Sequence, residues 1–153
     1  MKESGVAKRI EEFGPPKLVY VPMAADIIHP GHINLLSEAA KYGRVMVGLF
    51  TDEAIASYKK PPSMDYGQRK AVVESLKFVK YVVRQSTKEY DENLIKYKPA
   101  YMVHGTDWRT GPLAASRLKA IDLMSTWGGE VIEPEYTQGV SSSAIKEHLR
   151  VET

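Results

Sequence analysis

The chain has 153 residues, of which 43% are hydrophobic and 26% charged, and this composition is typical of one soluble globular domain. It contains no cysteine, which excludes disulfides, thiolate catalysis and zinc sites with cysteine ligands. The net charge of +2 is too small to indicate nucleic-acid binding. No apolar run approaches the roughly 20 residues of a membrane span, and the charged N-terminus is unlike a secretory signal. We therefore expect a cytoplasmic protein without nucleic-acid or membrane partners.

The N-terminal part, residues 1–16, is expected to form an arm ahead of a single domain at 17–153. Val6, Ile10 and Phe13 have helical spacing, which predicts a short amphipathic helix that ends at Gly14-Pro15-Pro16. A partly disordered arm is the alternative interpretation.

The domain opens with an apolar segment, residues 17–22, which predicts a first strand. A helix is expected to begin near Pro30, because proline suits the first helical position, and to end at Gly43. Residues 44–50 are continuously apolar, as expected for a parallel strand that is covered on both faces.

A short helical segment is predicted from Thr51, followed by a loop. The next helix is expected to begin near Asp65, where Gln68 is placed to complete a capping box. A third strand is predicted over 81–84 and a further helix over 90–97.

The last part of the chain repeats this alternation. We expect a fourth strand at 100–104, a helix at about 113–127, a fifth strand at 130–133 and a last helix that ends at about Arg150. Alternating strands and helices predict a Rossmann-like, doubly wound α/β fold with a five-stranded parallel sheet.

Unusual polar segments follow three of the predicted strands: His29 and His32 after the first, Asp107 and Trp108 after the fourth, and residues 137–143 after the fifth. Ligands bind at the carboxyl ends of strands in such sheets. We therefore expect these segments to meet in one cleft.

The segment His29-Pro30-Gly31-His32 combines two imidazoles, a backbone position without a Cβ and a helix N-terminus. Residues three apart at a helix start project to the same side, and helix N-termini attract anions. This combination suits stabilisation of charge on a phosphoryl group in transfer. One alternative is a half-built metal site, for which His104 is the only plausible third histidine, and another is that the two histidines are merely polar residues at a helix start.

The same four residues match the H-x-G-H motif of the nucleotidyltransferase superfamily, and within it the chain resembles the cytidylyltransferases. The segment from Tyr136 to Ser143 holds the place of their second signature, R-T-x-G-I-S-T-T. Residues 23–32 and 103–108 look most like the cytidylyltransferase domains associated with phosphoenolpyruvate mutase in phosphonate biosynthesis. The resemblance covers residues from about 18 to 149.

The resemblance implies in-line attack by a phosphate-type oxygen on the α-phosphorus of CTP, with release of pyrophosphate and without a covalent enzyme intermediate. It implies these catalytic residues: His29, His32, Lys59, Lys60 and Lys77. It implies these nucleotide contacts: Ala24, Ala25, Gly31, His104, Asp107, Thr137, Gly139, Val140, Ser141 and Ser142. It implies these acceptor contacts: Asp26, Trp108 and Tyr136.

Several of these assignments have alternatives. Lys59 and Lys60 either belong to a catalytic loop or form a solvated surface pair, and which of the two matches the family lysine stays open. Lys77 either matches a basic position of the family or is an ordinary surface lysine. Trp108 either lines the pocket or is a core aromatic, and Arg69 matches a recurrent arginine that we interpret as a packing or dimer residue.

The chain departs from the family pattern at three places. Ala24-Ala25 replaces T-F before Asp26, Thr106 replaces the first Asp of D-D-W, and Tyr136 replaces an arginine that can grip phosphate. The departure at Tyr136 weakens any inference that glycerol 3-phosphate is the acceptor.

The resemblance also implies Mg²⁺ with the nucleotide, although no carboxylate cluster resembles a dedicated cage, so the metal ligands stay unknown. Family habit implies a homodimer. The competing hypotheses are a glycerol-3-phosphate or choline-phosphate type of cytidylyltransferase, an adenylyltransferase of the FAD synthetase type, and a non-catalytic nucleotide-binding module.

Overall fold

The computed structural model describes residues 16–135 and Ile145. It contains a five-stranded sheet in which every paired neighbour is parallel, in the order β3-β2-β1-β4-β5. Its strands are β1 (Leu18–Met23), β2 (Arg44–Phe50), β3 (Val79–Gln85), β4 (Tyr101–Val103) and β5 (Glu130–Ile132). The predicted Rossmann-like α/β fold is therefore confirmed.

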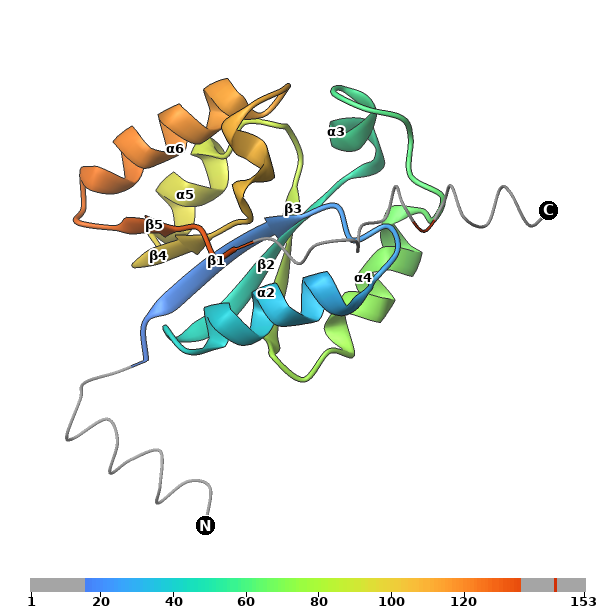
Figure 1. Ribbon diagram of the computed structural model, residues 1–153, viewed down its shortest axis with the longest axis horizontal. Helices are drawn as coiled ribbons and strands as arrows, with labels where there is room; N and C mark the ends of the chain where they lie inside the picture. The colour runs from blue at the N-terminus through green and yellow to red at the C-terminus, as the bar shows by residue number, and fades with distance from the viewer. Residues whose placement is uncertain (1–15, 136–144, 146–153) are drawn as a thin grey trace, which may run out of the picture.

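Helices flank the sheet on both sides (Figure 1). They are α2 (Pro30–Ala40), α3 (Asp52–Ala56), α4 (Tyr66–Glu74), α5 (Asp91–Tyr97) and α6 (Ala114–Ser125), with a one-turn 3₁₀ helix, η1 (Thr106–Arg109). α2 and α4 cover one face, and α5 and α6 cover the other (Figure 1). The predicted arm, apart from Pro16, and the predicted last helix, apart from Ile145, lie outside the described residues.

Alternation along β1 divides the apolar core between the two faces of the sheet. Val19 and Val21 face α2 and α4, where they join the cluster of Leu36 and Val73. Tyr20 faces the other way, into a cluster with these residues from β4, α5 and α6: Met102, Leu94 and Met124. The sheet is thus buried on both faces, as its continuously apolar strands predicted.

A buried polar network lies below the second face of the sheet. The Tyr20 hydroxyl donates to Gln85 Oε1 and accepts a hydrogen bond from Asn93 Nδ2 at 2.9 Å. A Cβ on Gly48 would collide with that hydroxyl. Only glycine therefore leaves room on β2 for the Tyr20 side chain.

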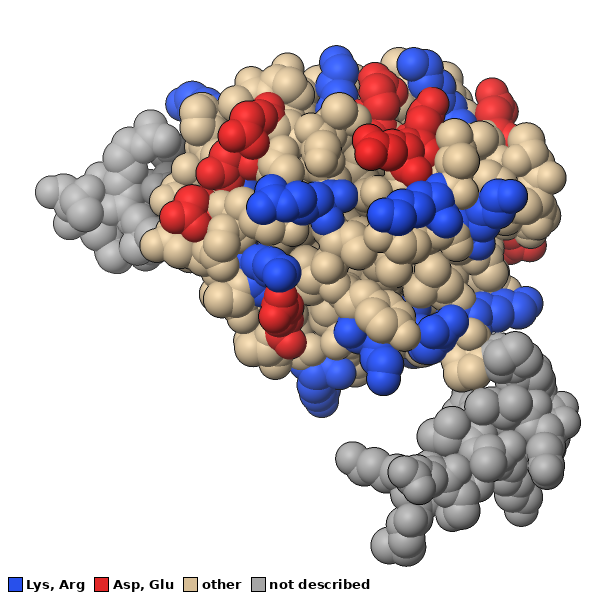
Figure 2. Space-filling model, turned by 180° about the vertical axis from the view of Figure 1, so that it is seen from behind, with Lys and Arg blue, Asp and Glu red and all other residues tan. Residues whose placement is uncertain are grey.

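Within the described residues, no helix combines the length and apolar character needed to cross a membrane. The face opposite the view of Figure 1 carries both basic and acidic side chains, with a band of Lys and Arg across its middle (Figure 2). Its charge is therefore mixed in sign.

Candidate active site

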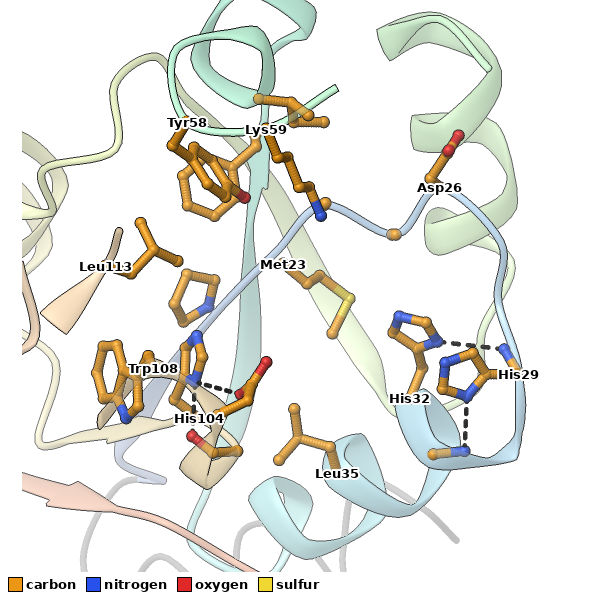
Figure 3. Close-up of a pocket in the computed structure, with 18 of the residues that line it drawn as sticks. Met23, Asp26, His29, His32, Leu35, Tyr58, Lys59, His104, Trp108 and Leu113 are labelled. Atoms are coloured by element: carbon orange, nitrogen blue, oxygen red, sulfur yellow. Dashed lines mark hydrogen bonds and ion pairs between the residues drawn. The ribbon is translucent and has the colours of Figure 1, made fainter. Parts of the chain in front are cut away.

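A cleft of about 710 Å³ lies at the carboxyl ends of β1 and β4. From β1 the chain continues into α2 on one face of the sheet, and from β4 it continues through η1 into α6 on the other. Ligands bind at this type of switch point in open α/β sheets. The structure thus brings together the polar segments that follow the first and fourth strands (Figure 3).

His29 and His32, which we call the histidine pair, close the N-terminus of α2 with their own side chains. His29 is the N-cap residue, and its Nδ1 accepts a hydrogen bond from the Gly31 N–H at 3.1 Å. His32 Nδ1 accepts from the backbone N–H of His29 at 3.2 Å, which makes a reciprocal capping box. The Gly31 amide is therefore engaged by an imidazole in this structure.

The capping box also fixes the tautomer of both rings. A neutral imidazole that accepts a hydrogen bond at Nδ1 carries its proton on Nε2. Burial lowers the pKa of His29, and burial together with the charges of His29 and Lys59 lowers the pKa of His32 to about 4. At neutral pH the pair therefore presents two neutral Nε2–H donors, with ring centroids 4.1 Å apart.

The loop that joins α3 to α4, residues 57–65, carries both candidate lysines, and we call it the lysine loop. Lys59 and Lys60 both line the cleft. The side chain of Lys59 extends into the cavity in Figure 3, and its charge contributes to the lowered pKa of His32. The structure therefore favours Lys59 as the lysine that would meet a phosphate beside the histidine pair.

Asp26 holds the lysine loop in place. Its side chain is 5% exposed, and its two carboxylate oxygens accept hydrogen bonds from the backbone N–H groups of Ser63 and Met64, each at 2.9 Å. Asp26 also lines the cleft. The preceding residue, Ala25, has a left-handed backbone (φ 54°), which an alanine adopts only at a cost of about 1–2 kcal/mol.

Arg69, from α4, supports the same loop from below and is wholly buried. Its guanidinium donates to these oxygens: Ala24 O (2.8 Å), Phe50 O (2.7 Å), Met64 O (3.0 Å) and Asp52 Oδ1 (2.5 Å). One side chain thus ties the ends of β1 and β2 to the lysine loop. This fits the interpretation of Arg69 as a packing residue, and its position beneath the cleft is what the sequence did not indicate.

The opposite side of the cleft is formed by His104 and Trp108, which we call the aromatic wall. Their rings are stacked, with centroids 3.9 Å apart and an interplanar angle of 7°. His104 Nδ1 donates to the Gly105 carbonyl oxygen at 2.8 Å, and burial lowers the pKa of His104, so its ring is neutral with Nε2 unprotonated. Trp108 is 1% exposed yet lines the cleft, so it is both a core aromatic and a pocket residue.

Several cleft residues carried no signal in the sequence. Phe50, Tyr58 and Leu113 line its apolar side near the aromatic wall. Burial, with a smaller effect of Asp107, raises the pKa of Tyr58 to about 12, so this hydroxyl stays protonated. Aromatic and aliphatic residues in a loop or at a strand end resemble ordinary core residues, and only the fold shows that they face a cavity.

Other predicted site residues are placed as follows. Ala24, Ala25, Gly31 and Asp107 line the cleft. Lys77 is an exposed residue between α4 and β3, at the amino end of the sheet, and is not brought to the cleft, because α4 already ends at Glu74. Outside the described residues lie Tyr136, Thr137, Gly139, Val140, Ser141 and Ser142.

Within the part of the chain that the structure describes, no group of three or more His, Asp or Glu side chains is arranged to hold a metal ion. The histidine pair uses both Nδ1 atoms in its capping box. The alternative interpretation of the pair as half of a metal site therefore has no support among the described residues.

Comparisons with known proteins agree with this geometry. A family model described as cytidylyltransferase-like matches residues 24–148. The Bifunctional protein HldE of Caulobacter vibrioides is 33% identical over 78% of this chain and 24% of its own length. The ethanolamine-phosphate cytidylyltransferase of Arabidopsis thaliana is 29% identical over 85% of this chain and 31% of its own length. The chain thus spans about a quarter to a third of these relatives.

Solved structures show the same fold. A lipopolysaccharide core biosynthesis protein from Thermoplasma volcanium has a TM-score of 0.66 and 23% identity, over 80% of this chain and 97% of that one. The pantothenate synthetase of Thermus thermophilus has a TM-score of 0.53 and 13% identity, over 93% of this chain and 68% of that one. Because the family model covers most of the domain, including both walls of the cleft, the chain belongs to the cytidylyltransferase-like family.

Proposed function

We propose that this protein transfers CMP from CTP to a phosphonate or phosphomonoester and releases pyrophosphate. An oxygen of the acceptor attacks the α-phosphorus in line, and the bond from that phosphorus to the bridging oxygen of pyrophosphate breaks. The observation that carries the proposal is the histidine pair, whose capping box leaves two neutral Nε2–H donors at the edge of the cleft.

The histidine pair and Lys59 would act by positioning and by charge stabilisation. Neutral Nε2–H groups donate to phosphoryl oxygens without giving up a proton, and the Lys59 ammonium adds a positive charge beside them. Asp26 and Arg69 keep the lysine loop against the cleft, so that Lys59 needs little rearrangement to reach a phosphate.

The acceptor would lie against the aromatic wall and the apolar side chains next to it, which moves His104 and Asp107 from the nucleotide contacts that the resemblance implies to the acceptor side. Asp107, whose side chain is 69% exposed, stands at the rim of this half of the cleft. Trp108 is 1% exposed and His104 stacks on its ring, so the exposed carboxylate of Asp107 is the group that would attract a cationic substituent. An acceptor with an ammonium group, such as 2-aminoethylphosphonate or ethanolamine phosphate, fits this half, and the Arabidopsis relative is named for the second of these.

Magnesium is expected to arrive with the triphosphate, because Mg²⁺ is usually held by substrate phosphates and only one or two carboxylates. The carboxylate of Asp26 is already engaged by the lysine loop. Since no group of three or more possible ligands is arranged for a metal among the described residues, the triphosphate itself would supply most of the ion's ligands. The ion would supply charge neutralisation on the phosphates.

The test is release of pyrophosphate from CTP and from ATP with four acceptors: 2-aminoethylphosphonate, ethanolamine phosphate, phosphocholine and glycerol 3-phosphate. We expect turnover with CTP and with an acceptor that carries an ammonium group. Turnover with ATP alone would instead support the adenylyltransferase hypothesis, and no turnover with any pair would contradict the proposal.

A further inference from the structure

Glu133, directly after β5, makes an unusually complete set of contacts for a carboxylate beside the cleft. Its Oε2 accepts a hydrogen bond from the Trp108 indole N–H at 2.6 Å. Arg117, on α6, donates to both of its oxygens at 3.0 Å. Arg109, on η1, adds longer contacts at 3.2 and 3.4 Å. One carboxylate thus ties the end of β5 to both η1 and α6.

Glu133 is held in the ionised form by these donors. The hydrogen bonds of Arg117, followed by those of Arg109 and Trp108, lower the pKa of Glu133 to about 2 against the opposing effect of burial. Its side chain is 12% exposed. A carboxylate with this pKa does not exchange protons near neutral pH, so its contribution is to hold its partners in place.

The Trp108 ring is 1% exposed and packs in the second apolar cluster, but apolar contacts of this kind are not directional. It belongs to η1, which has a single turn and no side-chain cap. Tyr90 contacts it at 5.7 Å in an edge-on geometry, which restrains one face of the ring, and His104 stacks on it at 3.9 Å. The indole N–H bond to Glu133 is the directional contact that sets the plane of the aromatic wall.

We propose that Glu133 is a positioning residue, which orients Trp108 and thereby the stacked His104 for the substrate that lies against the aromatic wall. This inference rests on the proposed function for the identity of that substrate, the acceptor. Glu133 itself does not line the cleft, so it acts through Trp108. The histidine pair and Lys59 are on the other side of the cleft and are expected to keep their arrangement when Glu133 is changed.

The test compares Glu133→Gln with Glu130→Gln in the full chain. Glu130 is an exposed carboxylate at the amino end of the same strand, far from the wall along β5. The first readout is the indole N–H resonance of Trp108 in the protein without substrate. The indole of Trp127 donates to the Pro99 carbonyl at 2.9 Å and serves as the internal reference.

We expect Glu133→Gln to move the Trp108 resonance and to leave that of Trp127 in place, whereas Glu130→Gln leaves the Trp108 resonance in place. With CTP and 2-aminoethylphosphonate or ethanolamine phosphate, we expect the acceptor KM to rise about tenfold, as for the loss of about 1.4 kcal/mol of binding, with kcat within about threefold. Glu133→Leu also removes the oxygen that accepts the hydrogen bond from the Trp108 indole. We therefore expect its acceptor KM to be higher than that of Glu133→Gln.

An unmoved Trp108 resonance would overturn the proposal, and so would a normal acceptor KM or a fall in kcat at constant KM. Failure of the proposed function looks different. The wild-type protein would then release no pyrophosphate with any acceptor, while the resonance of Trp108 would still respond to the change at Glu133.

Discussion

Replacement of Arg69 by methionine tests whether this buried side chain supports the cleft. Methionine keeps much of the volume and removes every donor. The change removes the guanidinium donor from three backbone oxygens, those of Ala24, Phe50 and Met64, and it leaves Asp52 without this ion pair.

The magnitude follows from these contacts. Each hydrogen bond to a charged group contributes about 1.5–3 kcal/mol, and the cost of burying the guanidinium offsets a large part of the sum. Removal of one partner from a buried ion pair costs about 3–5 kcal/mol. The side chain of Asp52 is 41% exposed and regains water. We therefore expect a loss of about 3–4 kcal/mol in the free energy of unfolding.

Urea denaturation at pH 7 measures this loss, and a thermal scan should show a melting temperature lower by roughly 10 °C. Arg84→Met is the matched control, because Arg84 is exposed and its guanidinium lies over the Tyr66 ring at 4.2 Å. That contact is worth about 0.5–1 kcal/mol. If Arg69→Met destabilised the protein no more than Arg84→Met, the reasoning about Arg69 would be refuted.

Three other changes probe the lysine loop, the sheet and the histidine pair. Lys59→Met should lower kcat by roughly 10²-fold, whereas the control Lys60→Met should lower kcat less than tenfold. Equal losses of kcat in steady-state kinetics would contradict the role given to Lys59. Gly48→Ala should destabilise the protein by about 1–3 kcal/mol in urea denaturation, because its Cβ would meet the Tyr20 hydroxyl; an unchanged midpoint would argue against that packing. The pKa of His32 is about 4 in the folded protein, against 6.5 in the unfolded chain. Between these values the unfolded chain is protonated at His32 and the folded protein is not, so the free energy of unfolding should fall as pH drops from about 6.5 toward 4. His32→Asn should remove that part of the pH dependence, and identical pH profiles would contradict the lowered pKa.

The sequence was sufficient to predict the fold and residues on both sides of the cleft. Continuous apolar strands and the proline at the start of α2 are local signals, and each of them agreed with the final architecture. His29 and His32 were recognisable because their spacing at a helix start is itself a local geometry. Their tautomers were not predictable, because these depend on which backbone N–H each ring accepts.

The remaining parts of the site depend on contacts between residues far apart in the chain. The resemblance marked Arg69 as a packing or dimer residue, but only the fold shows that its guanidinium reaches the ends of β1 and β2. Glu133 reads as a surface acid after a strand, although it fixes Trp108. The position of Lys77 also depends on long-range structure. Because α4 ends at Glu74, Lys77 lies in the connection to β3 at the amino end of the sheet, away from the cleft.

The most direct test of the central claim compares pyrophosphate release from CTP by the wild-type protein and by His32→Asn, with the acceptor that the wild type prefers. The asparagine amide oxygen can replace Nδ1 as the acceptor of the His29 N–H, so the cap is kept while the Nε2–H donor is lost. The account predicts acceptor-dependent release by the wild type and a fall in kcat of roughly 10²-fold in the variant, with its melting temperature preserved at pH 7. Equal rates in the two proteins, or no release from CTP by the wild type with any acceptor, would contradict it.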